Sequence, residues 1–378
     1  MPKIDVLNRS IVFDNPIQHL RSRHGYFPGI EQLQNKELIA LFAIGEAFES
    51  VDLTTYISRS IDNGKTWQLQ GPLCSRDAFD SPVSIFLKPT VLNDGKIIAM
   101  GYIFYRINPE YAIGNPETNG ILSGDIITSF SNDDGRTWSV PGVVPRTRAE
   151  LIEVSGPCIQ LKNGDLLASG GLFSMWDGTL PSGQLGILLR SADGGRSWDD
   201  SVSFFETIDR SVTPFESRLC EMSDGNIVAL AWAYNQYKGI SLNNHFTISH
   251  DNGYTWSQPI DTHIEAQASN LIWLGGSQLL TVHAHRGEAD TGLFVRLVDL
   301  SYEKWQVIYE KKVWGGDSSD VAGRLSSVFK TLKFGQPSLL RLSESEFLLT
   351  HWSIEDGQGR ILLHRLQVTL LETALYQR

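Results

Sequence analysis

Hydrophobic and polar positions along the chain form a repeating pattern, in which two short apolar runs flank a polar turn. The clearest case lies between Pro89 and Met100, where Asn93-Asp94-Gly95 separates two runs rich in Val, Leu, Ile and Ala. Asn-Gly or Asp-Gly between such runs is a strong signal for a tight β-hairpin. Further turns of this kind, some of them weaker, occur at Asn35-Lys36, Asn163-Gly164, Asp224-Gly225, Gly275-Gly276 and Ser345-Glu346. The pattern therefore predicts six hairpins.

A second pattern is the segment Ser-x-Asp-x-Gly-x-Thr/Ser-Trp, which we call the Asp segment. Its four copies run from Ser60 to Trp67, Ser131 to Trp138, Ser191 to Trp198 and Ser249 to Trp256. A self-similar segment that recurs every 71, 60 and 58 residues indicates one supersecondary unit repeated along the chain. The Asp can accept hydrogen bonds from the backbone of its own turn, and the Gly permits positive φ. We therefore interpret the four Asp residues as structural and exclude them from the candidate site.

The two patterns combine into one repeated sheet. The hairpin supplies two strands, the third strand enters the Asp segment, and the fourth leaves it. Six four-stranded antiparallel units predict an all-β fold, a six-bladed β-propeller in a single domain over residues 1–378. The expected blades span about 25–70, 85–145, 154–208, 214–262, 266–312 and 334–370, and residues 9–13 complete the last blade as its outer strand.

Composition narrows the class of protein. A net charge of -11 without a basic tract argues against a nucleic-acid or anionic-membrane partner. The N-terminal residues lack an apolar stretch long enough for a secretory signal, and no later run is long enough to span a membrane, so a cytoplasmic location is expected. Three cysteines without metal-ligand spacing favour reduced thiols. We expect no cofactor and no metal, and leave the oligomeric state open.

The two faces of such a propeller differ in their loops. Hairpin turns and Asp segments share one face, so the other face carries the loops between second and third strands together with the blade connectors. Loops on a rigid scaffold are where binding and catalysis concentrate. The first residues of the innermost strands should ring the channel on that face: Tyr26, Phe27, Lys88, Ser155, Glu216, Ser269, Asn270 and Gln336.

Four Asp segments on a six-bladed plan resemble the sialidase (neuraminidase) superfamily over nearly the whole chain. Family sialidases bind a carboxylate with three arginines and use an Asp as acid/base and a Tyr nucleophile assisted by a Glu. The resemblance implies that Glu216 stands for the assisting Glu and Arg286 for the third arginine. Tyr26 occupies the place of the first arginine, Trp232 lies near that of the second, and Gln336 replaces the Tyr. An amide cannot form a glycosyl intermediate, so the resemblance implies a carbohydrate-active enzyme atypical of sialidases.

Glu216 is the leading catalytic candidate, because a carboxylate at the start of an inner strand points toward the channel and is costly to bury unpaired. The alternative is an ion pair with Arg218, on the same face of the strand. Glu46, Glu49 or Asp52 could supply a general acid, or could lie in a solvated loop. The substrate-binding candidates are His24, Tyr26, Lys88, Arg218, Trp232, His285, Arg286 and Gln336.

These residues lead to one main hypothesis and two alternatives. The main hypothesis is a hydrolase that cleaves a small glycoside, which can be anionic, by general acid/base catalysis through an activated water. The first alternative is a sugar-acid lyase or isomerase, with Tyr26, His24 or His285 as base and Arg286 neutralising charge. The second is a glycan-binding propeller without turnover.

Overall fold

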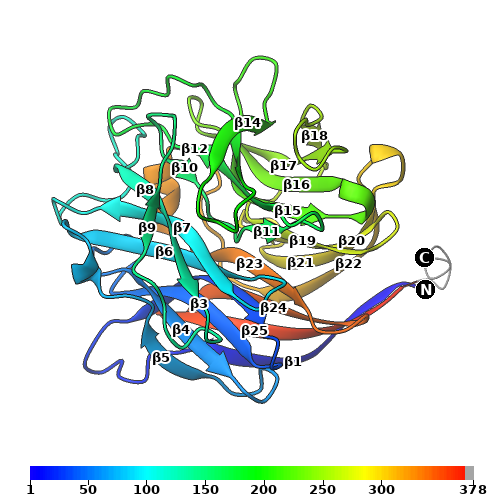
Figure 1. Cartoon of the computed structure of the whole chain (residues 1–378), viewed down its shortest axis with the longest axis horizontal. Helices are drawn as coiled ribbons and strands as arrows, with labels where there is room; N and C mark the ends of the chain where they lie inside the picture. Colours follow the sequence, from blue (N-terminus) through cyan, green and yellow to red (C-terminus); the bar gives the residue numbers. More distant parts are fainter. Residues whose placement is uncertain (371–378) are drawn as a thin grey trace.

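The computed structural model describes residues 1–370, which form a ring of six antiparallel sheets (Figure 1). Blades 1 and 2 contain β2 (His24–Gln32), β3 (Leu38–Gly45), β4 (Thr54–Ser60) and β5 (Gln68–Pro72), then β6 (Val83–Val91), β7 (Ile97–Tyr105), β8 (Gly124–Ser131) and β9 (Gly142–Val144). Blade 3 contains β10 (Ile152–Glu153), β11 (Ile159–Gln160), β12 (Leu166–Leu172), β13 (Gly186–Ser191) and β14 (Asp199–Phe205). Its inner strand is split, because β10 and β11 both pair with β12.

The remaining three blades repeat the plan and close the ring. Blades 4 and 5 contain β15 (Thr213–Glu221), β16 (Ile227–Asn235), β17 (Ile240–Ser249) and β18 (Ile260–Asp261), then β19 (Ser269–Gly275), β20 (Gln278–His285), β21 (Gly292–Asp299) and β22 (Gln306–Gly315). Blade 6 contains β23 (Phe334–Arg341), β24 (Glu346–Glu355) and β25 (Gln358–Thr369), and β1 (Lys3–Phe13) pairs with β25 as its outer strand. The predicted six-bladed propeller closed by the N-terminal strand is confirmed, and that strand is longer than the predicted residues 9–13.

The Asp segments form tight turns between third and fourth strands. Asp62 Oδ1 accepts hydrogen bonds from the backbone N–H groups of Lys65 (3.1 Å) and Thr66 (2.9 Å), and Oδ2 accepts one from the Thr66 hydroxyl (2.6 Å). These bonds, led by that of the Thr66 hydroxyl, lower the pKa of Asp62 to about 2. Asp133, Asp193 and Asp251 make the corresponding bonds. The Asp carboxylates therefore stabilise their own turns.

The second strand of each blade forms much of the core. Every residue of β3, β12 and β16 is buried, whereas the outer strand β5 is mostly exposed. Strands that are covered on both faces have near-continuous apolar sequences, as β3 has in Leu-Ile-Ala-Leu-Phe-Ala-Ile-Gly. Within residues 1–370, no helix is both long and apolar enough to cross a membrane.

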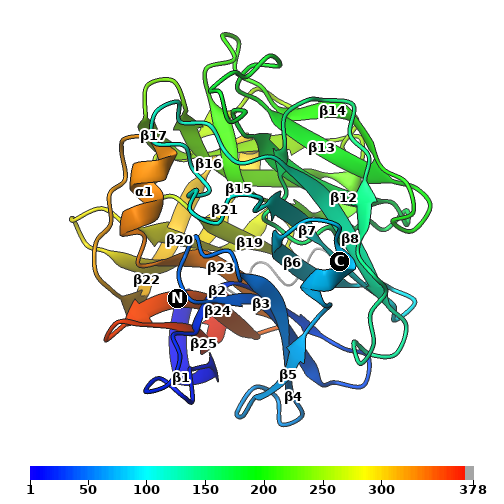
Figure 2. The same cartoon turned by 90° about the vertical axis from the view of Figure 1, so that its left-hand side faces the viewer.

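A short helix, α1 (Leu325–Thr331), lies in the connector between blades 5 and 6 (Figure 2). The connector reaches the loop between β7 and β8, because the Arg324 guanidinium donates to the carbonyl of Glu117 (2.7 Å) and the Leu325 N–H donates to Asn119 Oδ1 (2.7 Å). The Gly323 N–H donates to the Gly239 carbonyl of the blade 4 loop (2.8 Å). Residues 323–325 thus bind loops of two other blades.

Candidate functional site

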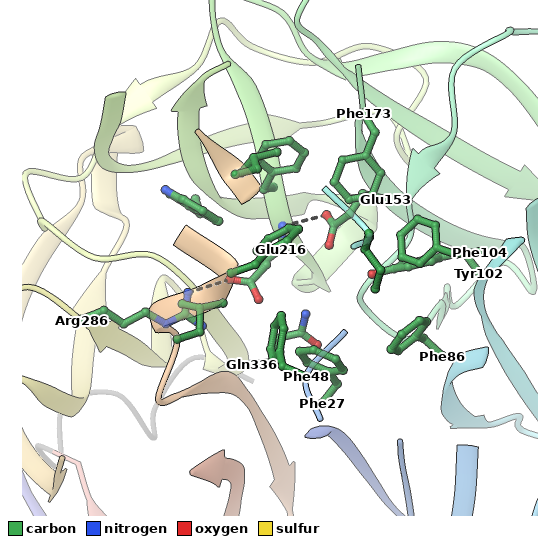
Figure 3. Close-up of a pocket in the computed structure, with 16 residues that line it drawn as sticks. Phe27, Phe48, Phe86, Tyr102, Phe104, Glu153, Phe173, Glu216, Arg286 and Gln336 are labelled. Atoms are coloured by element: carbon green, nitrogen blue, oxygen red, sulfur yellow. Dashed lines mark hydrogen bonds and ion pairs between the residues drawn. The ribbon is translucent and has the colours of Figure 1, made fainter. Parts of the chain in front are cut away.

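A central pocket lies at the inner strands of five blades, and blade 5 contributes Arg286, directly after β20 (Figure 3). Its cavity volume is about 70 Å³, counted as room for the centres of water-sized molecules. Its polar lining consists of Glu153, Glu216, Arg286 and Gln336. The rest of the lining is aromatic or aliphatic: Phe27, Phe48, Phe86, Tyr102, Phe104, Ile113, Phe173, Phe215, Trp232, Leu325, Phe329 and Leu332.

Three of the inner strands carry a β-bulge that faces this pocket. Phe27 in β2, Glu216 in β15 and Gln336 in β23 have φ angles of 57°, 48° and 42°, and each lies at a shift in strand register. Non-glycine residues rarely adopt positive φ, and such strain concentrates at binding and active sites. A bulge also changes the direction of a side chain relative to the regular strand. All three side chains line the pocket.

Each bulge is held by a polar side chain from a neighbouring blade. The contacts are Lys88 Nζ donating to the carbonyls of Phe27 (2.8 Å) and Pro28 (3.2 Å), the Glu216 N–H donating to Glu153 Oε2 (2.9 Å), and Asn270 Nδ2 donating to the Pro337 carbonyl (3.2 Å). A buried backbone group without a partner is costly, so these contacts stabilise the strained strands. Contacts between blades therefore help to fix the geometry of the pocket.

Glu153 and Glu216 form a pair of buried carboxyl groups in the pocket (Figure 3). Their exposed fractions are 3% and 8%. Burial, and secondarily the charge of Glu216, raises the pKa of Glu153 to about 8. Glu216 Oε2 instead has a cation beside it, because Arg286 Nη1 lies 3.5 Å away. The Glu153 carboxyl is thus protonated at neutral pH, whereas Glu216 is paired with a guanidinium.

The cations around the channel are engaged with protein acceptors. Arg286 Nε donates to the Phe334 carbonyl (2.8 Å), and its Nη1 donates to Gln267 Oε1 (2.8 Å). Arg218 Nη1 donates to Ser155 Oγ (3.2 Å) and to the Ser217 carbonyl (2.8 Å). The ion-pair partner of Glu216 is therefore Arg286, on another blade, while the guanidinium of Arg218 is bound by Ser155 and Ser217 and does not line the pocket.

Tyr102 in β7 lies on the same side of the pocket as Glu153 (Figure 3). Burial raises the pKa of its phenol well above the ordinary value, and Glu153 and Glu216 add to the shift. The phenol is consequently a hydrogen-bond donor at neutral pH. Lys88 lines a smaller cavity that shares Phe27, Tyr102 and Gln336 with the central pocket, and burial lowers the pKa of Lys88 well below the ordinary value.

The acidic residues of the β3–β4 loop have structural contacts. Glu49 Oε1 accepts hydrogen bonds from the backbone N–H groups of Ile113 (2.8 Å) and Gly114 (3.2 Å), and burial raises the pKa of Glu49. Asp52 Oδ1 accepts the N–H of Glu46 (3.1 Å), whose side chain is exposed. These bonds order the loop that brings Phe48 into the pocket lining.

The other predicted binding residues are distributed as follows. Trp232 lines the pocket and donates its Nε1–H to Ser241 Oγ (2.7 Å). Tyr26 is buried with its ring centroid 5.3 Å from that of Trp352. The remaining two make structural hydrogen bonds: His24 Nδ1 accepts the Gly359 N–H (2.8 Å), and His285 Nε2 accepts from Arg296 Nη2 (3.0 Å).

Sequence reasoning missed Glu153 and most of the aromatic lining. Glu153 is a carboxylate among apolar residues in the first part of the split inner strand, which is the same signal that selected Glu216. The missed aromatic residues carry no comparable signal, because apolar side chains occur throughout the chain's strands and the loops beside them: Phe48, Phe86, Tyr102, Phe104, Phe173 and Phe215.

Comparison with known proteins identifies relatives in structure only. No protein-family model and no curated protein matches the chain. A protein of unknown function from Dyadobacter fermentans DSM 18053 is 17% identical with a TM-score of 0.73, covering 98% of this chain and 100% of that one. The Hadza microbial sialidase Hz136 is 18% identical (TM-score 0.64; 93% and 66% covered). A Penicillium chrysogenum α-L-arabinanase complexed with arabinobiose is 15% identical (TM-score 0.63; 96% and 98% covered).

These likenesses define the class of fold. The chain has a six-bladed β-propeller fold similar to those of the sialidase and the arabinanase, which is the fold that its sequence resemblance implied. Several of its structural neighbours are glycoside hydrolases by name, including sialidases, the arabinanase and an α-L-arabinofuranosidase from Fusarium graminearum. Because these sequence identities are below 20%, the likeness shows the fold alone. The chemistry has to be inferred from the residues of the pocket.

Proposed function

We propose that the protein is a glycoside hydrolase that cleaves a small glycoside by general acid/base catalysis in the central pocket. The observation that carries the proposal is the buried pair Glu153 and Glu216 in a pocket lined largely by aromatic side chains. Most glycoside hydrolases use two carboxyl groups, one of which is protonated at the start of the reaction. Aromatic side chains supply apolar surface against which a sugar ring can pack.

In this mechanism Glu153 is the general acid and Glu216 the general base. Glu153, with its raised pKa, donates its proton to the leaving-group oxygen as the bond from that oxygen to the anomeric carbon breaks. Glu216 accepts a proton from the water that forms the new bond to the anomeric carbon. The carboxyl groups of Glu46, Glu49 and Asp52 are the weaker candidates for the acid, because Glu49 and Asp52 already accept backbone hydrogen bonds within ordered loops.

Attack by water is favoured over a covalent intermediate. The amide of Gln336 is a poor nucleophile, and the raised pKa of Tyr102 keeps its phenol protonated. A single displacement by water inverts the anomeric configuration. NMR of the first-formed sugar product tests this, and net retention of configuration contradicts direct attack by water.

The proposal is tested by screening the purified protein against neutral and acidic 4-nitrophenyl glycosides. On any substrate that is turned over, Glu153→Gln and Glu216→Gln should each lower kcat by about 10²- to 10⁴-fold. Full activity in Glu216→Gln contradicts the assigned role. Binding of a sugar without product would favour a non-catalytic glycan-binding propeller, and an unsaturated product that absorbs in the ultraviolet would favour a lyase.

A further inference from the structure

The Gln336 amide is a polar group that the protein leaves for a ligand. Gln336 is 6% exposed and lines the central pocket from the bulge of β23. Its Oε1 is buried and has no hydrogen-bond partner among the residues described. Buried acceptors are satisfied in nearly all proteins, so an unpartnered amide in a side chain that lines a cavity calls for a partner from a bound molecule. A hydroxyl group both donates and accepts, so it satisfies this amide in either of its flipped orientations.

The cation in the pocket is poorly placed to receive a second carboxylate. Arg286 donates from Nε to the Phe334 carbonyl and from Nη1 to Gln267, and Nη1 also faces Glu216 at 3.5 Å. Gly335 packs against its Nη2 so closely that a Cβ at this position would collide with it. Bidentate binding of a ligand carboxylate needs two free, parallel N–H groups, and the bonds from Nε and Nη1 to protein acceptors leave only Nη2 without one.

The carboxyl groups of the pocket also disfavour binding of an anionic ligand. Glu153 and Glu216 are both buried in the lining, and Arg286 is the single cationic side chain among the lining residues described. A ligand carboxylate would lose its water in an aromatic pocket and would lie near the charge of Glu216, which disfavours its ionised form. The hydroxyl groups of a neutral sugar can instead donate to Glu216 and to Gln336.

We propose that the pocket selects an uncharged sugar, with Gln336 as a specificity-determining residue that accepts a hydrogen bond from a sugar hydroxyl. This inference rests on the proposed function, because it names the substrate class of the same site. It differs from the hypothesis drawn from the sequence, which allowed an anionic substrate. The structural reason is that protein acceptors already bind Nε and Nη1 of Arg286, whereas the amide oxygen of Gln336 has no partner among the described residues.

Matched sugars test the selection. Methyl glucoside against methyl glucuronide, and methyl galactoside against methyl galacturonide, differ only in a carboxylate at C6, and methyl arabinosides, methyl xylosides and N-acetylneuraminic acid complete the panel. Isothermal titration calorimetry at neutral pH should show that the tightest ligand is neutral and binds at least about tenfold more tightly than an acidic counterpart. An acidic sugar as tightest ligand overturns the inference, as does no binding by any member up to about 10 mM.

Variants separate recognition from a structural role. Gln336→Met keeps the length of the side chain and removes the acceptor, so it should weaken the neutral sugar about tenfold while the melting temperature stays equal or rises. A lower melting temperature with unchanged affinity overturns the inference. Gln278→Met is the matched control, because Gln278 Oε1 is also buried without a partner among residues 1–370 but lies at the blade 5 hairpin. The control should bind the sugar as the wild type does.

The binding assay also keeps the two proposals distinguishable. Selective binding of a neutral sugar without its hydrolysis would refute the proposed hydrolase and leave the selectivity intact. Hydrolysis of an acidic glycoside in preference to its neutral counterpart would refute the selectivity and leave the hydrolase intact.

Discussion

The substitution Glu153→Gln tests whether the pocket holds a carboxyl group that is protonated at neutral pH. The folded-state pKa of Glu153 is about 8, against an ordinary value of 4.5. The folded protein therefore keeps a proton that the unfolded chain releases, and this raised pKa stabilises the fold at low pH only. The contribution is complete below pH ~4.5 and is lost as the pH rises through about 8.

The size of this change in stability follows from the difference between the folded-state and unfolded-state pKa of Glu153. A difference of one pKa unit corresponds to about 1.4 kcal/mol, so a rise from 4.5 to about 8 makes the Glu153 contribution to the free energy of unfolding fall by about 5 kcal/mol across this range. The amide that Glu153→Gln introduces does not titrate and can still accept the N–H of Glu216. The variant should consequently gain stability relative to the wild type as the pH rises, and should lose most of its hydrolytic activity.

Urea denaturation of both proteins at intervals between pH 5 and pH 9 measures this difference. Glu31→Gln is a suitable control, because burial also raises the pKa of Glu31 to about 8, while this residue lies near the far end of β2. The control should show a similar change in pH dependence and retain activity. If the wild-type and Glu153→Gln curves stay parallel over the whole range, Glu153 is ionised in the folded protein and cannot be the acid proposed.

Three further substitutions test the site and its support. Glu216→Gln should lower kcat with little change in KM, whereas a raised KM with unchanged kcat would assign the residue to binding alone. Lys88→Met leaves two carbonyls of the blade 1 bulge without their donor, so it should lower the free energy of unfolding by about 2 kcal/mol in chemical denaturation. Unchanged stability would contradict this role of Lys88. Gly335→Ala should displace Arg286 and weaken sugar binding by calorimetry, whereas wild-type affinity would show that the guanidinium position is unimportant.

The architecture was predictable because its signals are local. Each Asp segment satisfies the hydrogen bonds of its own turn, as the contacts of Asp62 show, so the turn carries the same residues wherever it recurs. Hairpin turns and continuous apolar strands such as β3 are equally local. Blade number, strand order and closure by the N-terminal strand could therefore be predicted from spacing alone.

The candidate site was predictable only in part. Glu216, Arg286 and Gln336 were selected by their place at inner strands and loops, and all three line the pocket. Glu153 was missed because its strand is split and begins before the expected blade boundary. Phe48 and the helix residue Phe329 enter the lining from segments far apart in sequence, a proximity that no local pattern encodes.

The sequence by itself determined a wheel of repeated sheets, because hairpins, Asp segments and apolar strands satisfy their own backbone and side-chain requirements over short stretches of chain. Only the tertiary structure decided which groups meet at the centre. The raised pKa of Glu153, the pairing of Glu216 with Arg286 and the free oxygen of Gln336 depend on burial and on distances between different blades. Those quantities arise when the ring closes and water leaves the channel, so they belong to no single segment.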